Sequence, residues 1–154
     1  MRQTAAGVPP HRRPTRQRGA AMTKPPSSHS IELHWQPGQN LVTWTYGHAH
    51  CRQQYPEPPL TVTAWPDPPS VIVVEAQQQP HPRIDNAVVF DPHGTERLRL
   101  QPPQVSSEPS WDIGFYQVYA DPSGLVAVFA TRTGDFWGKP DLTTGELKNT
   151  AQWR

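Results

Sequence analysis

The chain has 154 residues, of which 34% are hydrophobic, and a formal net charge of +1 at pH 7. This length suits one domain, and the single cysteine, Cys51, excludes an intramolecular disulfide. The sequence contains no apolar run long enough to span a bilayer, so we expect no membrane association. A cytoplasmic location fits these features best.

The first 29 residues differ in composition from the rest. They hold five prolines, six Lys or Arg residues, no acid and no aromatic side chain, which predicts a disordered, basic, proline-rich tail. Residues 30–154 then carry eight basic and thirteen acidic side chains, a net charge of −5. A basic tail without aromatic residues predicts at most weak nucleic-acid binding, which salt would suppress and removal of residues 1–21 would abolish.

Residues 30–154 are predicted to form a single antiparallel β domain. Their fifteen prolines lie mostly between short apolar runs, which excludes helices of ordinary length. Two similar turns, Asp91–Gly94 and Asp121–Gly124, have the Asp-Pro-x-Gly pattern of hairpins in which Asp accepts a backbone hydrogen bond. We predict an all-β meander of about 8–10 strands, folded as a twisted sandwich or partial barrel.

The early strands are predicted from alternation. A turn at Pro37-Gly38 places Leu33 opposite Val42, with an apolar and a polar face on the hairpin. Two strands follow, over 60–65 and 71–75. The run Val71–Val74 lacks alternation, which predicts a strand buried on both faces.

The two Asp-Pro-x-Gly hairpins differ in their flanking residues. If Asp91 pairs with Thr95, the hairpin has one apolar face, and Arg97 and Arg99 point into water. The same register applied to Asp121–Gly124 gives apolar residues on both faces. This second hairpin is therefore expected to be central in the fold.

The strongest candidate for a binding surface lies at the open end of the second hairpin. Antiparallel pairing is expected to bring two aromatic and acidic segments together there. Large aromatic side chains with a polar group are typical of binding surfaces. The alternative is that these side chains plug the end of the sheet as part of the core. The predicted binding residues are Trp111, Asp112, Asp135, Phe136 and Trp137.

A metal site is the alternative chemical hypothesis. In a strand, His48 and His50 would point to one face and could share a metal ion, with a third ligand left open among His34, His81 and His93. The aspartates of the turns already have a structural role, and the motifs of nucleophilic or nucleotide-binding sites are absent. We therefore assign no catalytic residue, no cofactor and no defined metal ligand from the sequence.

The C-terminal half resembles small uncharacterised bacterial all-β proteins with propeller-like hairpin turns. The resemblance is carried by residues 86–94, 114–119 and 141–147, the last with the Asp-x-x-Thr-Gly pattern, and it implies no activity. Taken together, the sequence favours a non-enzymatic protein-interaction module, including an immunity-type inhibitor. The runner-up is a metal-dependent enzyme or metal-binding protein that uses His48 and His50.

Overall fold

The computed structural model describes residues 30–153, so the predicted tail over 1–29 lies outside the described residues. The described part is all-β, apart from one 3-10 turn, η1 (Pro109–Trp111), and its eleven strands form three antiparallel sheets. The predicted fold class is thus confirmed, with open sheets in place of a closed barrel. Each sheet is a meander of consecutive strands.

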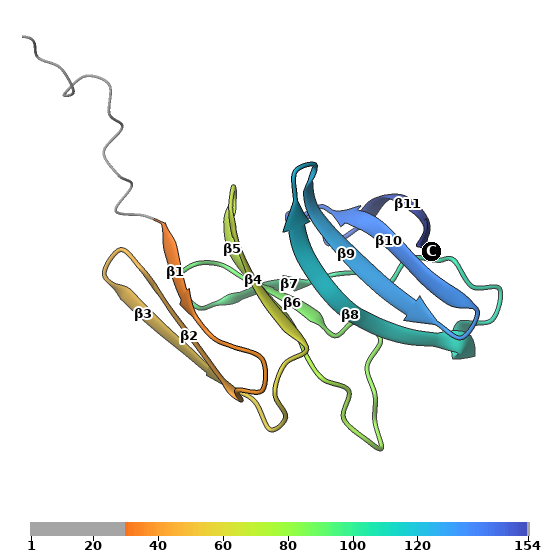
Figure 1. Cartoon of the computed structure of the whole chain (residues 1–154), viewed down its shortest axis with the longest axis horizontal. Coiled ribbons are helices and arrows are strands. Elements are labelled where there is room, and N and C mark those ends of the chain that lie inside the picture. The colour runs from red at the N-terminus through yellow and green to blue at the C-terminus, as the bar shows by residue number, and fades with distance from the viewer. Residues whose placement is uncertain (1–29, 154) are drawn as a thin grey trace, which may run out of the picture.

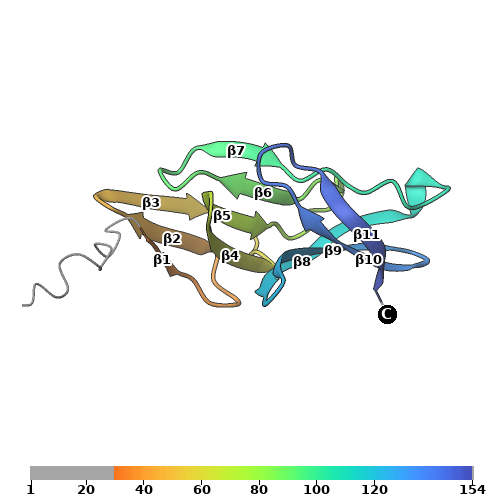
Figure 2. The same ribbon diagram turned by 90° about the horizontal axis from the view of Figure 1, so that it is seen from above.

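The sheets follow one another along the chain (Figures 1 and 2). Sheet A has three strands, and sheets B and C have four each. Sheet A contains β1 (Ile31–His34), β2 (Leu41–Tyr46) and β3 (Ala49–Gln54). Sheet B contains β4 (Thr61–Pro66), β5 (Pro69–Val74), β6 (Ala87–Phe90) and β7 (Glu96–Arg99). Sheet C contains β8 (Asp112–Asp121), β9 (Gly124–Thr131), β10 (Gly134–Pro140) and β11 (Leu147–Trp153).

Sheet B is the middle layer, because its two central strands are buried on both faces. Val71 and Val73 pack with Val42 and Trp44 of sheet A. Successive residues of a strand point to opposite faces, so the neighbours of these two valines in β5 belong to the other core. That core joins the second face of sheet B to sheet C and includes Ile72, Val74, Val89, Leu100, Phe115, Val118, Ala127 and Phe129. All four residues of Val71–Val74 are fully buried, which confirms the two-sided strand.

The first hairpin has the predicted faces but a different register. Leu33 pairs with Trp44 and Ile31 with Tyr46, a shift of two residues from the prediction. An even shift leaves every side chain on its expected face. The reason for the shift is a longer loop, in which the Trp35 indole donates to Gln39 O and the Gln36 amide donates to the Gln39 side chain.

A third strand of sheet A follows a tight turn that the sequence analysis did not identify. Tyr46 pairs with Ala49, so Gly47 and His48 are the two turn residues. Gly47 has φ +60°, which suits the first central position of a type II′ hairpin turn. Sheet A also contacts the turn of sheet B, since the buried Trp44 indole donates to Pro92 O at 2.9 Å.

The predicted solvent positions of Arg97 and Arg99 are wrong. A bulge places Leu98, and not Arg97, opposite Val89, so strand β6 is buried on both faces. Arg97 donates to Ser70 Oγ at 2.8 Å, and Arg99 forms an ion pair with Glu75 in which its side chain is only 18% exposed. The Arg99–Glu75 ion pair and the hydrogen bonds of Arg97 to Ser70 Oγ and Pro69 O make the second face of the hairpin compatible with partial burial.

The second hairpin is not packed on both sides as expected, because sheet C is an outer layer with β8 at its edge, and its register also differs by one residue. Asp121 pairs directly with Gly124, which leaves Pro122 and Ser123 as a two-residue loop. Strand β9 lies between β8 and β10, and its residues 125–129 are all buried. The structural role of the turn aspartates is confirmed, because the carboxylates of Asp91 and Asp121 each accept a backbone N–H two residues further on.

A buried asparagine joins sheets B and C. Asn86 is 1% exposed, and its side chain donates to Glu75 O and Phe115 O and accepts from Phe115 N, at 2.7–2.9 Å. Beside it, the Thr63 hydroxyl donates to Val118 O. These side chains satisfy backbone groups on the β8 edge that pairs with no strand, where a buried unpaired group is costly.

We predict that Asn86→Ala lowers the free energy of unfolding by about 3 kcal/mol or more, because it leaves several buried backbone groups without partners. Denaturant unfolding measures this loss. Asn40→Ala is the control, since the Asn40 side chain bonds only the carbonyls of Tyr55 and Pro56 at the surface of a loop. A loss no larger than that of Asn40→Ala would show that Asn86 does not hold the two sheets together.

Candidate functional site

The outer face of sheet A has the composition of an ordinary solvated surface. Pairing in sheet A places its side chains on two faces, and the face away from sheet B carries one aliphatic residue, Leu41. Its other members are polar or charged, namely Glu32, His34, Thr43, Thr45, His50, Arg52 and Gln54. This alternation of apolar and polar residues is what a half-buried antiparallel sheet requires.

The outer face of sheet C departs from this rule. Tyr119 pairs with Val126 and Trp137 pairs with Val128, and paired residues share a face. Their neighbours Leu125, Ala127 and Phe129 point to the opposite side, into the core shared with sheet B. The outward positions include Gln117, which pairs with Val128, and Asp135, which pairs with Ala130. We call the aromatic and aliphatic members of this outward set, Tyr116, Tyr119, Val126, Val128 and Trp137, the aromatic face.

The rings of the aromatic face shield its aliphatic centre. Val126 and Val128 are 4% and 0% exposed, while Tyr119 and Trp137 on the flanking strands are half-buried. Strands β4 and β5 of sheet B contact sheet C at β8. Ile72 and Val74 of β5 lie in the core on the opposite face of sheet C from the aromatic face. The aromatic face therefore combines a rigid apolar floor with ring edges open to solvent.

One hydrogen bond fixes a ring on this face. The Tyr116 hydroxyl on β8 donates to Asp135 Oδ2 on β10 at 2.9 Å, across strand β9. Asp135 pairs with Ala130, which places it on the outer side of sheet C with Tyr116. Burial, and then the bond to Asp135 and its negative charge, raise the pKa of Tyr116 to about 12.

The five residues predicted as a binding edge are distributed over both sides of sheet C. Asp135 and Trp137 belong to the outer face, whereas Phe136 pairs with Phe129 and points to the core side. Asp112 pairs with Thr131, next to Ala130 in β9, and so lies on the side opposite Asp135.

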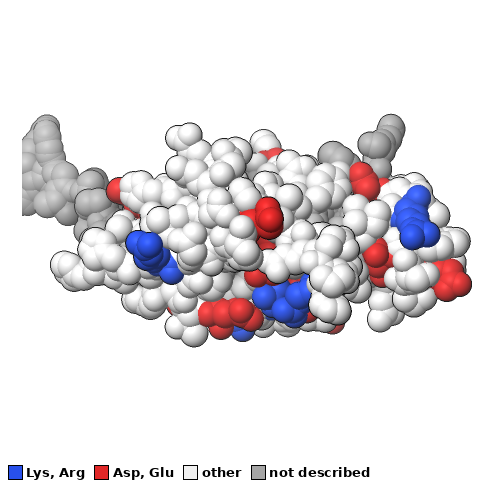
Figure 3. Space-filling model, turned by 90° about the horizontal axis from the view of Figure 1, so that it is seen from below, with Lys and Arg blue, Asp and Glu red and all other residues white. Residues whose placement is uncertain are grey.

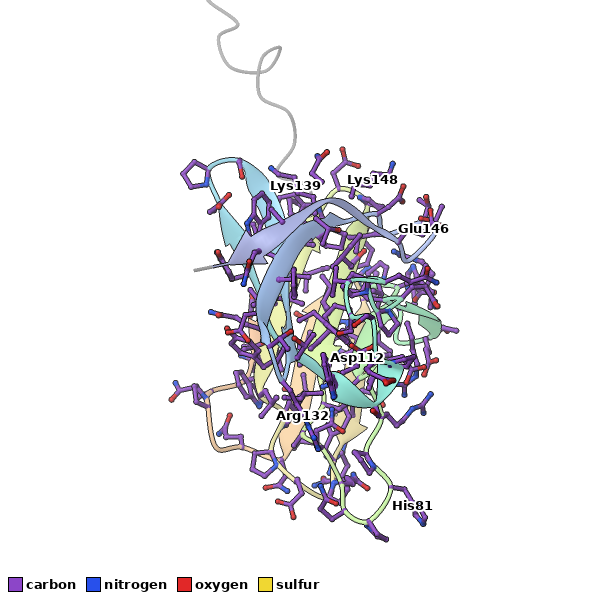
Figure 4. The ribbon with its side chains drawn as sticks, turned by 90° about the vertical axis from the view of Figure 1, so that its right-hand side faces the viewer. His81, Asp112, Arg132, Lys139, Glu146 and Lys148 are labelled. Atoms are coloured by element: carbon purple, nitrogen blue, oxygen red, sulfur yellow. The ribbon has the colours of Figure 1, made fainter. Side chains whose placement is uncertain are left out.

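The two ends of sheet C carry different groups. Trp111 ends the 3-10 turn, and its carbonyl accepts from Arg132 N. Figure 4 shows Asp112 and Arg132 at this end of sheet C, far from Lys139 and Lys148 at the other. The Asp112 carboxylate accepts from the Ser106 hydroxyl at 2.9 Å, so it has a local partner of its own.

The sequence analysis missed Tyr116 and Tyr119 as members of the face. The predicted register, with Asp121 opposite Leu125, puts Tyr119 on the side of Phe129, whereas the observed two-residue loop pairs it with Val126. The alternation of Val126 and Val128 with Leu125 and Ala127 was visible, but both sets are apolar, so only the loop length decides which set faces outward.

The predicted histidine pair does not form on one strand face. His48 is a turn residue and His50 lies in β3 on the outer face of sheet A, both exposed. Among residues 30–153, no group of three His, Cys, Asp or Glu side chains is arranged to hold a metal ion. Within the same residues no helix has the length and apolar character needed to cross a membrane.

A second feature of interest is a cavity of about 260 Å³ below the loop that joins β5 to β6. It is lined by Tyr55, Glu75, Gln77, Arg83, Asn86 and Arg99, with Pro56, Glu57, Ala76, Gln78 and His81 completing its wall. His81 lies at the tip of this loop, away from the sheets (Figure 4).

Comparisons of this chain with protein-family models, with curated proteins and with solved structures found no match. The functional argument therefore depends on the geometry of the two features above.

We predict that Asp135→Asn lowers the pKa of Tyr116 but leaves it above 10, because the charge is removed while burial, the largest cause, remains. The Tyr116 hydroxyl is held protonated in the fold, so its contribution to stability is complete below pH 10 and is lost as pH rises toward 12. Carbon-13 chemical shifts of the tyrosine rings, followed from pH 9 to 12.5, measure this pKa. Asp121→Asn is the matched control, and an equal shift in both variants would contradict the assignment.

Proposed function

We propose that this chain is a non-enzymatic protein-interaction module that binds a protein partner through the aromatic face of sheet C. The observation that carries the proposal is the contrast between the two outer faces. Sheets A and C cover the same central sheet from opposite sides, yet one outer face is polar and the other presents Trp137, Tyr116 and Tyr119 around two valines. Trp and Tyr are the side chains most enriched at the energetic centres of interfaces.

The size of the face supports a compact interface. Four strands spaced about 4.8 Å apart, over about seven residues each, project to roughly 400 Å². This is the area of the whole outer face of sheet C, of which the aromatic face is the apolar part. It is sufficient for the desolvated centre of a standard interface, which buries about 800 Å² on each partner when its polar rim is included.

Charge favours a basic partner. Residues 30–154 carry an excess of five acidic side chains, and complementary charge speeds association and selects among partners. On the side of the molecule in Figure 3, acidic and basic groups are scattered and in places adjacent, without a continuous basic patch. An immunity-type inhibitor that neutralises a basic protein is one form of this proposal.

The proposal also places the module in the cytoplasm. Cys51 is a buried free thiol, and burial raises its pKa, so it stays in the protonated and less reactive form. A lone reduced cysteine suits a reducing compartment. The weak nucleic-acid binding expected of the basic tail concerns residues 1–29 and stays a separate prediction.

We predict that Trp137→Ala weakens partner binding at least tenfold, since truncating a central interface tryptophan costs about 2 kcal/mol or more. Proteins captured by the wild-type chain are identified by mass spectrometry, and the candidate partner is then purified and titrated calorimetrically. Trp35→Ala, which removes a half-buried tryptophan from the loop between β1 and β2, is the control and should bind normally.

The fold of each variant is checked by circular dichroism and thermal unfolding. Tyr119→Lys provides a second test, because it places a charge on the same face without removing Trp137 from Val128. If Trp137→Ala unfolds the domain and Tyr119→Lys binds as tightly as wild type, the aromatic face is a structural surface and the proposal is wrong.

A further inference from the structure

One half-buried carboxylate beside the aromatic face has no cation next to it. The Asp135 carboxylate accepts, within residues 30–153, only the hydrogen bond from the Tyr116 hydroxyl to its Oδ2. No Lys or Arg side chain of these residues forms an ion pair with it. Its second oxygen, Oδ1, is open to solvent, because Tyr55 Oη is the only buried side-chain oxygen or nitrogen in the described part that lacks a hydrogen bond.

The other half-buried acids of the described part are compensated locally or lie elsewhere. Four of them have an ion pair or cap a turn, namely Glu75, Asp85 and Asp141 in ion pairs and Asp91 in its turn. The pairs of Glu75 and Asp85 also neutralise the arginines in the wall of the cavity below the β5–β6 loop. Asp112 is the nearest equivalent of Asp135, with one hydroxyl donor and no ion pair, but it lies on the opposite side of sheet C.

Two aromatic rings lie beside Asp135. Trp137 follows it by two positions in β10, so both side chains point outward and their Cα atoms are about 6.6 Å apart. Tyr116 already contacts the carboxylate at 2.9 Å. Its pKa is raised to about 12, so the ring stays neutral and its hydroxyl remains a donor. A carboxylate flanked by neutral aromatic rings attracts a cation, both through its charge and through the π faces of the rings.

The basic side chains nearest to this position do not occupy it. Lys139 shares the outer side of β10, but its ammonium donates to Ser123 O and Oγ at 3.0 and 2.9 Å, at the tip of the hairpin between β8 and β9. Arg132 lies exposed in the turn before Asp135, and Figure 4 shows it at the opposite end of sheet C from Lys139. An incoming cation therefore displaces no ion pair of the described residues.

We propose that Asp135, Trp137 and Tyr116 form a site that receives an arginine side chain of the protein partner. This inference rests on the proposed function and names the group that the aromatic face recognises. A guanidinium can donate to Asp135 Oδ1 while its plane packs against the Trp137 indole, and it is less strongly hydrated than the ammonium of lysine. The acidic excess of residues 30–154 attracts a basic partner to the same surface.

The first test uses N-acetyl-arginine methylamide as the probe. Its counterpart is N-acetyl-citrulline methylamide, which has the same shape with a neutral urea group. Each is titrated into the full-length, nitrogen-15-labelled chain while the indole N–H signal of Trp137 is recorded. We expect the arginine probe to shift this signal in a saturable manner and to bind at least about threefold more tightly than the citrulline probe. Equal binding of the two probes, or no saturable shift, would overturn the proposal.

Asp135→Asn is the decisive variant, because an amide still accepts from the Tyr116 hydroxyl but carries no charge. It should weaken binding of the arginine probe about three- to tenfold and remove its advantage over the citrulline probe. Asp112→Asn is the matched control and should leave the affinity unchanged. Arginine binding that is as tight in Asp135→Asn as in wild type, or that falls equally in both variants, would contradict the assignment.

The purified partner separates this inference from the proposed function. We expect Asp135→Asn to weaken partner binding about three- to tenfold, with the fold checked by circular dichroism. If Trp137→Ala weakens partner binding and Asp135→Asn does not, the face binds its partner without an arginine, so this inference is wrong and the proposed function stands. If both variants fold and neither weakens binding, both proposals are wrong.

Discussion

The structure depends on a central sheet that cannot face water on either side. Strand β5 has four consecutive aliphatic residues, Val71–Val74, and each is fully buried. Such a strand is stable only if two further layers cover it, because every second side chain points the opposite way. Sheets A and C provide these layers, and the chain reaches them without long crossovers because each sheet is a meander. The outer faces of A and C therefore form the two broad surfaces of the molecule. Because neither face packs against the central sheet, the core does not constrain its composition.

The side chains that join sheets B and C also shape the cavity beside them. The unpaired edge of β8 is satisfied by side chains, mainly Asn86, and so the loop that ends at Asn86 must have a fixed shape. Gln77 fixes that shape from within, and it also bonds Ile113 O at the start of β8. The same constraints explain Gly114, where a Cβ atom would come within 2.6 Å of the Gln77 side chain. These hydrogen bonds give the loop and the wall of the adjacent cavity their shape.

Much of the fold could be predicted from the sequence, because turn chemistry and burial are local signals. The two-sided strand at Val71–Val74 and the turns at Asp91 and Asp121 are examples. Register was harder to predict, since Asp-Pro-x-Gly closes a longer loop at Asp91 and a two-residue loop at Asp121. A hairpin loop that differs by one residue moves every following side chain to the other face. The Asp, Pro and Gly positions are common to both turns, so this pattern alone does not set the loop length.

The candidate binding face shows the same difficulty of predicting register from sequence. Trp137 and Phe136 are adjacent aromatic residues in a strand, so one must point outward and the other toward sheet B. The sequence does not tell them apart, because the partners of both on β9, Val128 and Phe129, are apolar and fully buried. Only the packing of Phe129 against Phe115, with ring centroids 5.0 Å apart, identifies the core side. Because Phe136 takes the core side, its neighbour Trp137 points to the outer face of sheet C. A tryptophan placed there, beside an ordered tyrosine on a sheet that already has a core on its other face, is the side chain that the proposed partner contact would use.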